Sequence, residues 1–225
     1  ASAGQLLNLN WKWEDIAKHL KINVRESMSA LDIKNNLLGV CDQMYLFEPG
    51  DDTTVCVLKA VKPKKVKLFT GPPSHKEDDA KVVHELMTNA DIRIVSGGTT
   101  SQIVARELGV EVKSSTEIYD KEVPPIAYIH GINLVTEGVL TLSKTIDRLK
   151  SLSKSLDSNI FKAKDGASQM AKLLYSASHI KLLVGRSLNI ANAEISFQRD
   201  LELRLHVIGE LEKILVKLGK IVTIE

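Results

Sequence analysis

The feature that most constrains the fold of this chain is an alternation of short β-branched runs with amphipathic stretches, which fills the sequence after residue 65. The runs expected to form strands are 66–69, 92–95, 110–113, 126–129, 180–184 and 220–224. The stretches expected to form helices are 77–89, 100–108, 138–152, 166–177 and 198–218. Strands that alternate with helices predict a mainly parallel sheet with helices on both faces. The expected fold class is therefore α/β.

The first 61 residues follow a different pattern. Apolar residues at helical spacing predict helices over 11–20 and 28–47, and the β-branched run 53–61 predicts a strand. The lysine-rich connector 62–65 contains Pro63, which stiffens it. The sequence therefore predicts two domains, a short helix–helix–strand unit at residues 1–61 and an α/β domain at residues 62–225.

Composition excludes several classes of protein. Apolar residues make up 44% of the 225 residues, but no apolar run approaches the roughly 20 residues that span a bilayer, so we expect a cytoplasmic protein without membrane contact. Thirty basic and 28 acidic residues are mixed along the chain, which argues against nucleic acid as a partner. Cys41 and Cys56 have no CxxC or Cys/His companion, which predicts reduced thiols.

The strongest loop signal is the stretch "IVSGGTTSQIVAREL" at 94–108. Its glycines, Gly97 and Gly98, allow a ligand close to the backbone, and the hydroxyls of Thr99 and Thr100 are placed to cap the following helix, whose free N–H groups attract anions. The loop matches neither of the common nucleotide-binding glycine motifs. A tight strand-to-helix turn with a threonine cap therefore remains the alternative to an anion site.

Three further loops follow or join predicted strands, at 69–73, 132–140 and 183–189. The carboxyl ends of parallel strands share one edge of a sheet, where ligands bind. We therefore predict one cleft for a small anionic or phosphorylated ligand, in which Arg186 binds the anion and Glu137 accepts a hydroxyl or an amine. The residues predicted to line it are Thr70, Gly71, Gly97, Gly98, Thr99, Thr100, Thr136, Glu137, Gly185, Arg186 and Asn189.

Two other functions remain open for the α/β domain. It could be an enzyme that acts on a phosphorylated small molecule with Glu137 or His130 as base, although no HExxH or GxSxG motif occurs. It could also be a structural module that forms a homodimer through the apolar face of helix 198–218. That face consists of Leu201, Leu205, Ile208, Leu211 and Leu215, which are more often core than interface.

Two stretches of residues 1–61 carry a family resemblance: "AGQLLNLNWKWEDIAKHL" at 3–20 and "EPGDDTTVCVL" at 48–58. They resemble the closing part of the metal-dependent protein serine/threonine phosphatases of the PPM superfamily, in the bacterial branch named for sporulation stage II protein E (SpoIIE). The later stretches "TGPP", "GGTTSQIVARELG", "VPPIA", "GINLVTEGVLTLSK", "DGAS" and "VGRSLN" are similar to the extension that follows the phosphatase domain in clostridial-type members. The resemblance attaches no activity to that extension.

The resemblance implies a signalling phosphatase in which two manganese or magnesium ions, held by aspartates, activate a water that attacks a phosphoprotein substrate. Asp51 matches one metal ligand of the family and Asp52 is its neighbour, but the early Asp-Gly motifs that supply the other ligands do not occur in this sequence. The resemblance thus implies a C-terminal piece of a larger phosphatase, whose metal site exists only in the complete parent. We expect no cofactor and no phosphatase activity for the piece alone, in which residues 49–52 also fit a plain turn.

Overall fold

The computed structural model describes residues 11–26, 28–48, 52–154, 160, 162–187 and 195–225. The chain divides into two compact units, residues 1–62 and residues 63–225, and the division falls inside the lysine-rich connector. No helix in the described residues is long and apolar enough to cross a membrane. Both cysteines are free thiols.

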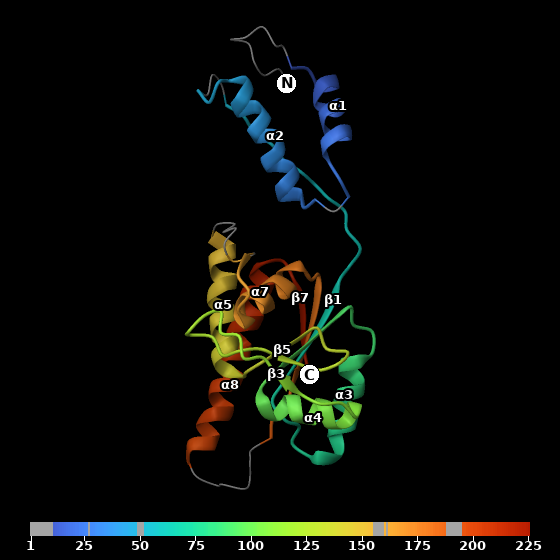
Figure 1. Ribbon diagram of the computed structural model, residues 1–225, viewed down its shortest axis with the longest axis vertical. Coiled ribbons are helices and arrows are strands. Elements are labelled where there is room, and N and C mark those ends of the chain that lie inside the picture. Colours follow the sequence, from blue (N-terminus) through green and yellow to red (C-terminus); the bar gives the residue numbers. More distant parts are fainter. Residues whose placement is uncertain (1–10, 27, 49–51, 155–159, 161, 188–194) are drawn as a thin grey trace. The chain divides into compact units, whose positions relative to one another are not determined.

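Unit 1 contains two helices, α1 (Trp13–Asn23) and α2 (Ala30–Met44), which match the two predicted helices (Figure 1). Ser29 is the N-cap of helix α2. Its hydroxyl accepts from the Asp32 N–H at 3.1 Å, and the Asp32 carboxylate accepts from the Ser29 N–H at 2.9 Å. This reciprocal capping box satisfies two backbone donors at the helix start.

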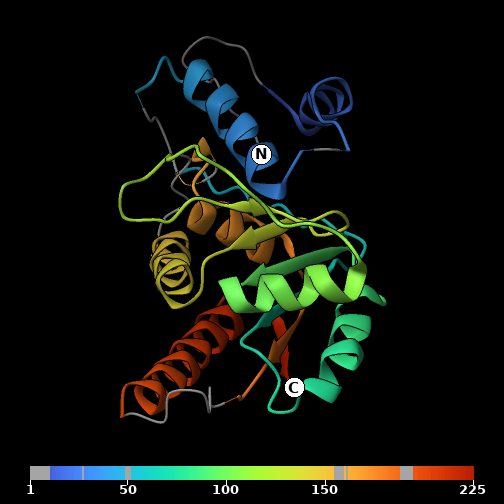
Figure 2. The same cartoon turned by 60° about the horizontal axis from the view of Figure 1, so that its bottom comes forward.

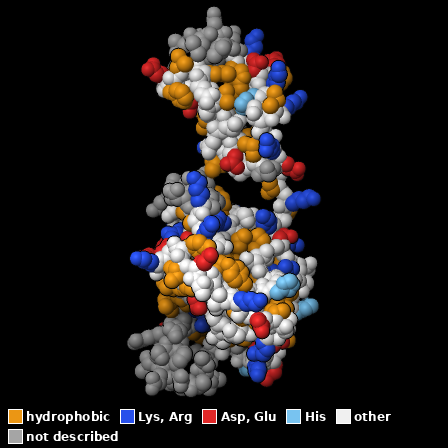
Figure 3. All heavy atoms as spheres, in the orientation of Figure 1, with side chains coloured by type: hydrophobic (Ala, Val, Ile, Leu, Met, Phe, Trp, Pro, Cys, Tyr) orange, Lys and Arg blue, Asp and Glu red, His pale blue; other side chains and the backbone are white. Residues whose placement is uncertain are grey.

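Unit 1 leaves much of its apolar surface uncovered. Among its described apolar residues only Trp11 and Cys41 are buried, whereas Trp13, Phe47 and Leu58 are exposed by 68%, 75% and 94%. Figure 3 shows apolar side chains, drawn in orange, on the visible face of this unit. The described residues of unit 1 therefore enclose very little hydrophobic core.

The strand predicted over residues 53–61 is not formed. Exposure alternates with period two from Val55 to Ala60, as it does in a strand, but no neighbouring strand pairs with this segment in the described chain. A strand needs a hydrogen-bonded neighbour as well as a suitable sequence. The segment is held instead by Lys59, whose ammonium donates to the carbonyls of Glu26 (2.5 Å) and Met28 (2.7 Å).

Unit 2 is built on a seven-stranded mixed sheet with the strand order β3-β4-β5-β2-β1-β6-β7 (Figures 1 and 2). The strands are β1 (Lys65–Thr70), β2 (Ile92–Ser96), β3 (Lys113–Ser114), β4 (Ala127–Tyr128), β5 (Leu134–Thr136), β6 (His179–Val184) and β7 (Ile221–Ile224). The run β5-β2-β1-β6-β7 is parallel, and β4 pairs antiparallel with both of its neighbours, β5 and β3. The predicted α/β class with a mainly parallel sheet is confirmed.

Helices cover both faces of this sheet because its central strands are apolar on both sides. Helices α3 (Asp79–Met87), preceded by the short 3-10 helix η2 (Lys76–Asp78), and α4 (Gly98–Leu108) pack with Phe69 and Leu183 on one face. Helices α5 (Val139–Lys154), α7 (Gly166–Ser176) and α8 (Ile195–Lys217) pack with Leu68 and Leu182 on the other. Adjacent strand residues thus enter different cores, as the pleat requires.

The apolar stripe of α8 belongs mainly to the protein's own core. Ile208, Leu211 and Leu215 are 2%, 0% and 0% exposed and pack beneath the sheet, whereas Leu205 is 40% exposed and Leu201 is half-buried. The core interpretation of this stripe is therefore confirmed for Ile208, Leu211 and Leu215, and the alternative of a dimerisation face keeps only Leu201 and Leu205.

Two other local predictions differ from the structure. The sequence predicts a loop over residues 132–140, but Leu134–Thr136 form strand β5, which pairs with β2 inside the sheet. The strands expected at 110–113 and 126–129 shrink to the two-residue pair β3 and β4. In each case the available partner strand, rather than the local sequence, sets the length of the pairing.

Candidate functional site

Four residues lie side by side in register where the central strands end. Thr136 of β5, Ser96 of β2, Thr70 of β1 and Val184 of β6 are successive Cα partners across the sheet. Because these residues are aligned, the loops after all four strands begin at the same height along the strand direction. Those predicted site residues that the structure describes therefore lie at or just beyond one edge of the sheet, as parallel strands require.

At the β2–β5 part of this edge, the structure brings together the loops that contain Gly97 and Glu137. The Gly97 N–H donates to the Thr136 carbonyl at 2.9 Å, and the Ser96 and Thr136 hydroxyls both donate to the Glu137 carbonyl, at 2.8 and 2.9 Å. A Cβ on Gly98 would lie 3.9 and 4.0 Å from the Glu137 carboxylate oxygens. The Glu137 side chain therefore lies beside the N-terminus of α4.

The threonine cap predicted for this helix is wrong. The N-cap is Gly97, which has φ of 118° and no side chain to cap the helix. Thr100 is buried inside the first turn, and Thr99 is exposed. The strand passes into the helix through Gly97 alone, because a residue without Cβ tolerates this positive φ.

At the β1–β6 part of the edge, the backbones of residues 70–72 and 185–187 are in direct contact. The Gly185 N–H donates to the Thr70 carbonyl at 2.9 Å, and the Ser187 N–H donates to the Pro72 carbonyl at 3.1 Å. A Cβ on Gly185 would lie 2.1 Å from the Pro72 carbonyl oxygen. Thr70, Gly71, Gly185 and Arg186 are thus neighbours here, whereas Asn189 lies outside the described residues.

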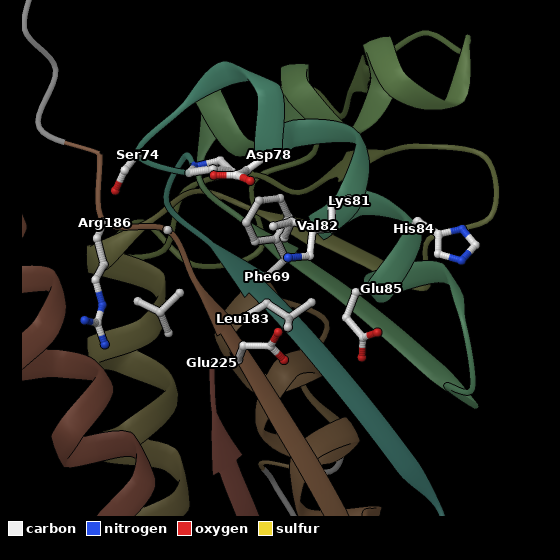
Figure 4. Close-up of a pocket in the computed structure, with 13 residues that line it drawn as sticks. Phe69, Ser74, Asp78, Lys81, Val82, His84, Glu85, Leu183, Arg186 and Glu225 are labelled. Atoms are coloured by element: carbon white, nitrogen blue, oxygen red, sulfur yellow. The ribbon is translucent and has the colours of Figure 1, made fainter.

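Strands β1 and β6 also mark the point where the chain changes face. From β1 the connection to β2 runs through α3 on one face, whereas the helices around β6 lie on the other face. Open α/β sheets bind ligands at such a switch point. A cleft of about 540 Å³, here called the switch-point cleft, opens at this position (Figure 4).

The switch-point cleft combines an apolar floor with charged walls. Its lining residues are Phe69, Pro73, Ser74, Asp78, Lys81, Val82, His84, Glu85, Leu183, Val184, Gly185, Arg186 and Glu225. In Figure 4 the Lys81 side chain extends into the cleft, His84 points away from it, and Arg186 lies at its other side. Within the described chain neither Lys81 nor Arg186 forms an ion pair.

A charge network closes one wall of this cleft. A Glu85 carboxylate oxygen accepts from Lys67 at 2.5 Å and from Lys181 at 2.9 Å, and Lys181 also pairs with Glu225. The hydrogen bonds from Lys67 and then Lys181 lower the pKa of Glu85 to about 2, although its side chain is 36% exposed. The Glu85 carboxylate is therefore already paired with Lys67 and Lys181. Within the described chain, the cations of the cleft that form no ion pair are Lys81 and Arg186.

A second, smaller cavity lies at the β2–β5 edge and has a volume of about 170 Å³; we call it the Glu137 crevice. Its lining residues are Gly98, Ser101, Gln102, Val112, Ser114, Pro125, Ile126, Ala127, Val135, Thr136 and Glu137. The residues predicted to line one cleft are thus divided between two cavities. Thr70, Gly71, Gly97, Thr99 and Thr100 line neither of them.

Several site residues were missed by the sequence analysis. In the switch-point cleft these are Ser74 from the loop after β1, Asp78 from η2 and Lys81 from α3. In the Glu137 crevice they are Gln102, Ser114 and Pro125, from three separate segments. Only their position after or beside predicted strands could have indicated them. His130 was placed near the edge, but it follows β4, which runs antiparallel to β5, and it therefore lies toward the opposite edge.

The metal ligands implied by the phosphatase resemblance do not form a site in the described chain. Asp51 lies outside the described residues, and Asp52 is exposed. The described residues contain no group of three or more histidine, cysteine or acidic side chains that could hold a metal ion.

Comparison with known proteins identifies no relative of this chain. A scan against protein-family models, a search of curated proteins and a search of solved structures each returned no match.

Proposed function

We propose that unit 2 is a ligand-binding module that takes a small anionic molecule, such as a phosphorylated metabolite, in the switch-point cleft. The observation that carries this proposal is the position of a 540 Å³ cleft at the switch between β1 and β6, with Lys81 and Arg186 unpaired in the described chain. That volume is in the range of pockets for small ligands. Both cations can form charge-assisted hydrogen bonds to an anion.

The charges along this edge of the sheet favour the switch-point cleft over the loop of Gly97 and Gly98 as the anion site. The Glu137 carboxylate lies beside the start of α4, where an anion would otherwise meet free N–H groups. A negative ligand there would be repelled by Glu137. In the switch-point cleft, Glu85 and Glu225 are paired with lysines, and the remaining acid, Asp78, is outnumbered by the cations Lys81 and Arg186.

Binding by charge-removing variants tests this proposal. Calorimetric titration of the chain with inorganic phosphate, sugar phosphates and nucleotides should find at least one ligand. Lys81→Gln and Arg186→Gln should each weaken its binding about tenfold, because a hydrogen bond to a charged group contributes about 1.5–3 kcal/mol. Lys121→Gln removes an exposed lysine outside the cleft and is the matched control. Unchanged binding by the double variant would contradict the proposal.

We further propose that residues 1–61 are the closing segment of a PPM-type serine/threonine phosphatase domain of the SpoIIE family, which unit 2 regulates. The sequence resemblance of this segment supports the proposal. So does its surface, because Trp13, Phe47 and Leu58 are exposed and residues 55–60 alternate in exposure as a strand does, with no partner strand in the described chain. A completed sheet would bury these side chains and pair that segment.

Phosphatase activity tests this second proposal. A longer chain that contains Asp-Gly metal-ligand motifs before Ala1 should hydrolyse a phosphoserine peptide in the presence of Mn²⁺. Asp51→Asn should abolish that hydrolysis, because the carboxylate would be a metal ligand. Asp42→Asn, an exposed acid on α2, is the control and should leave the rate unchanged. An encoding gene without such motifs, or full activity in Asp51→Asn, would overturn the proposal.

A further inference from the structure

The Glu137 crevice gathers four segments that are distant in sequence. Helix α4 supplies Gly98 and Gln102, β3 supplies Ser114, the segment before β4 supplies Pro125, and the end of β5 supplies Glu137. The start of α7 closes the wall from behind, because a Cβ on Gly166 would lie 3.1 Å from Ile126 and 3.3 Å from Thr136. The crevice is therefore built by the tertiary fold and is not a groove in one loop.

Three polar side chains of the crevice have no partner within the described chain, whereas the hydroxyls of Ser101 and Thr136 donate to backbone carbonyls. The side chains of Gln102, Ser114 and Glu137 make no hydrogen bond or ion pair there. The first backbone N–H of α4 that donates within the described chain is that of Ser101, which donates to the Gly97 carbonyl. The N–H groups of Gly98, Thr99 and Thr100, in the first turn, have no acceptor there. A carboxylate, an amide, a hydroxyl and the backbone N–H of Gly98 thus line one small space, beside the start of α4.

These groups select the chemistry of a ligand by their charges. An anion accepts from the N–H groups of α4 but is repelled by Glu137. An ammonium donates to Glu137 but is opposed by the positive end of the helix. A hydroxyl can donate to Glu137 and accept from an N–H group at the same time. Gln102 and Ser114 can also both donate and accept, so they pair readily with further hydroxyls.

The geometry points to a second binding site in this protein, at which the Glu137 crevice takes the vicinal hydroxyls of a sugar or polyol. Its volume of about 170 Å³ is below that of pockets for drug-sized molecules, so it fits one sugar ring or the polyol end of a larger molecule. Glu137 accepts from one hydroxyl, and Gln102 and Ser114 contact its neighbours. This site is separate from the anion site proposed for the switch-point cleft.

Amide spectra of the whole chain, titrated with a panel of probes, test this inference. D-ribose, D-glucose and myo-inositol supply vicinal hydroxyls, and ethylammonium and inorganic phosphate supply the two excluded charges. We expect at least one hydroxyl probe to shift the amide resonances of Gly98, Gln102 and Ser114 at millimolar concentration. Neither charged probe should shift them. If phosphate or ethylammonium shifts these resonances, or if no hydroxyl probe does, the inference is wrong.

Variants then assign the binding to the crevice. Glu137→Gln keeps the size of the side chain and should weaken binding of the hydroxyl probe about tenfold, as expected for a hydrogen bond to a charged group. Glu111→Gln changes an exposed acid outside the crevice and should have no effect. Lys81→Gln should also leave this binding unchanged, which separates the two sites. Binding of equal strength by Glu137→Gln, with the core resonances preserved, would overturn the assignment.

Discussion

Gly185→Ala should destabilise unit 2 by about 3 kcal/mol, at the upper end of what overpacking costs. The added Cβ would lie 2.1 Å from the Pro72 carbonyl oxygen and 2.2 Å from that of Gly71. Both are backbone atoms, which cannot rotate aside as the end of a side chain can. The loops at 70–72 and 185–187 would have to separate, and with them the hydrogen bonds between Gly185 and Thr70 and between Ser187 and Pro72.

Urea unfolding followed by circular dichroism measures this loss, and Gly209→Ala is the matched control. Gly209 lies in α8, where a Cβ would meet no atom within 4 Å. Alanine is the better helix former, so this control should raise the unfolding free energy by about 0.5 kcal/mol. If Gly185→Ala is as stable as the original chain, the close contact between the two loops is wrong. The same variant should weaken anion binding in the switch-point cleft, which Gly185 lines.

Glu85→Gln should lower stability at neutral pH by about 2 kcal/mol, because it leaves the ammonium of Lys67 without its carboxylate in a site where that side chain is 9% exposed. Lys67 keeps its bond to the Glu85 carbonyl, at 2.6 Å. Lys181 retains Glu225 as a partner, so Lys67 carries most of the loss. The effect is kept modest by the solvent exposure of Glu85, which screens the pair.

The pH dependence of stability provides an independent readout of this network. The folded pKa of Glu85 is about 2, below its ordinary value of 4.5, so the folded protein holds the proton less tightly than the unfolded chain. Its contribution is therefore fully present above pH 4.5 and is lost as the pH falls toward 2. The unfolding free energies of the original chain and of Glu85→Gln should converge over that range.

A variant at a second glutamate distinguishes protonation of Glu85 from a general loss of stability in acid. Glu77→Gln changes an exposed glutamate in η2 and should run parallel to the original chain across the same pH range. A constant difference between the original chain and Glu85→Gln down to pH 2 would show that the Lys67–Glu85 pair does not carry the stability ascribed to it.

The sequence was most informative where a local pattern coincides with burial. The β-branched runs at 66–69, 92–95 and 180–184 became the central strands β1, β2 and β6, because a strand buried on both faces must be apolar throughout. It was least informative for β5, whose three residues are too few to show a pattern. Lys67 and Lys181 likewise look like exposed charges in a strand, and only pairing of β1 with β6 places them around Glu85.

The candidate site, too, was predictable in part from the sequence and in part only from the tertiary structure. Loops that follow parallel strands were expected at one edge, and the register of Thr136, Ser96, Thr70 and Val184 places them there. The sequence did not reveal that these loops open two cavities instead of one. That outcome depends on Glu137 lying beside Gly98 and on the contact between Gly71 and Gly185, which are separated by many residues along the chain.

By itself the sequence determined the helices of unit 2, its strands β1, β2, β6 and β7, and which loops follow the central strands at the carboxyl edge of the sheet. Those properties follow from local propensity and from the period of apolar residues. Only the tertiary structure decided the strand order, the failure of residues 53–61 to form a strand, the direction of β4 that removes His130 from the edge, and the division of the site into two cavities. The physical reason is that pairing and packing join residues far apart in the chain, and no local pattern encodes which partners will meet.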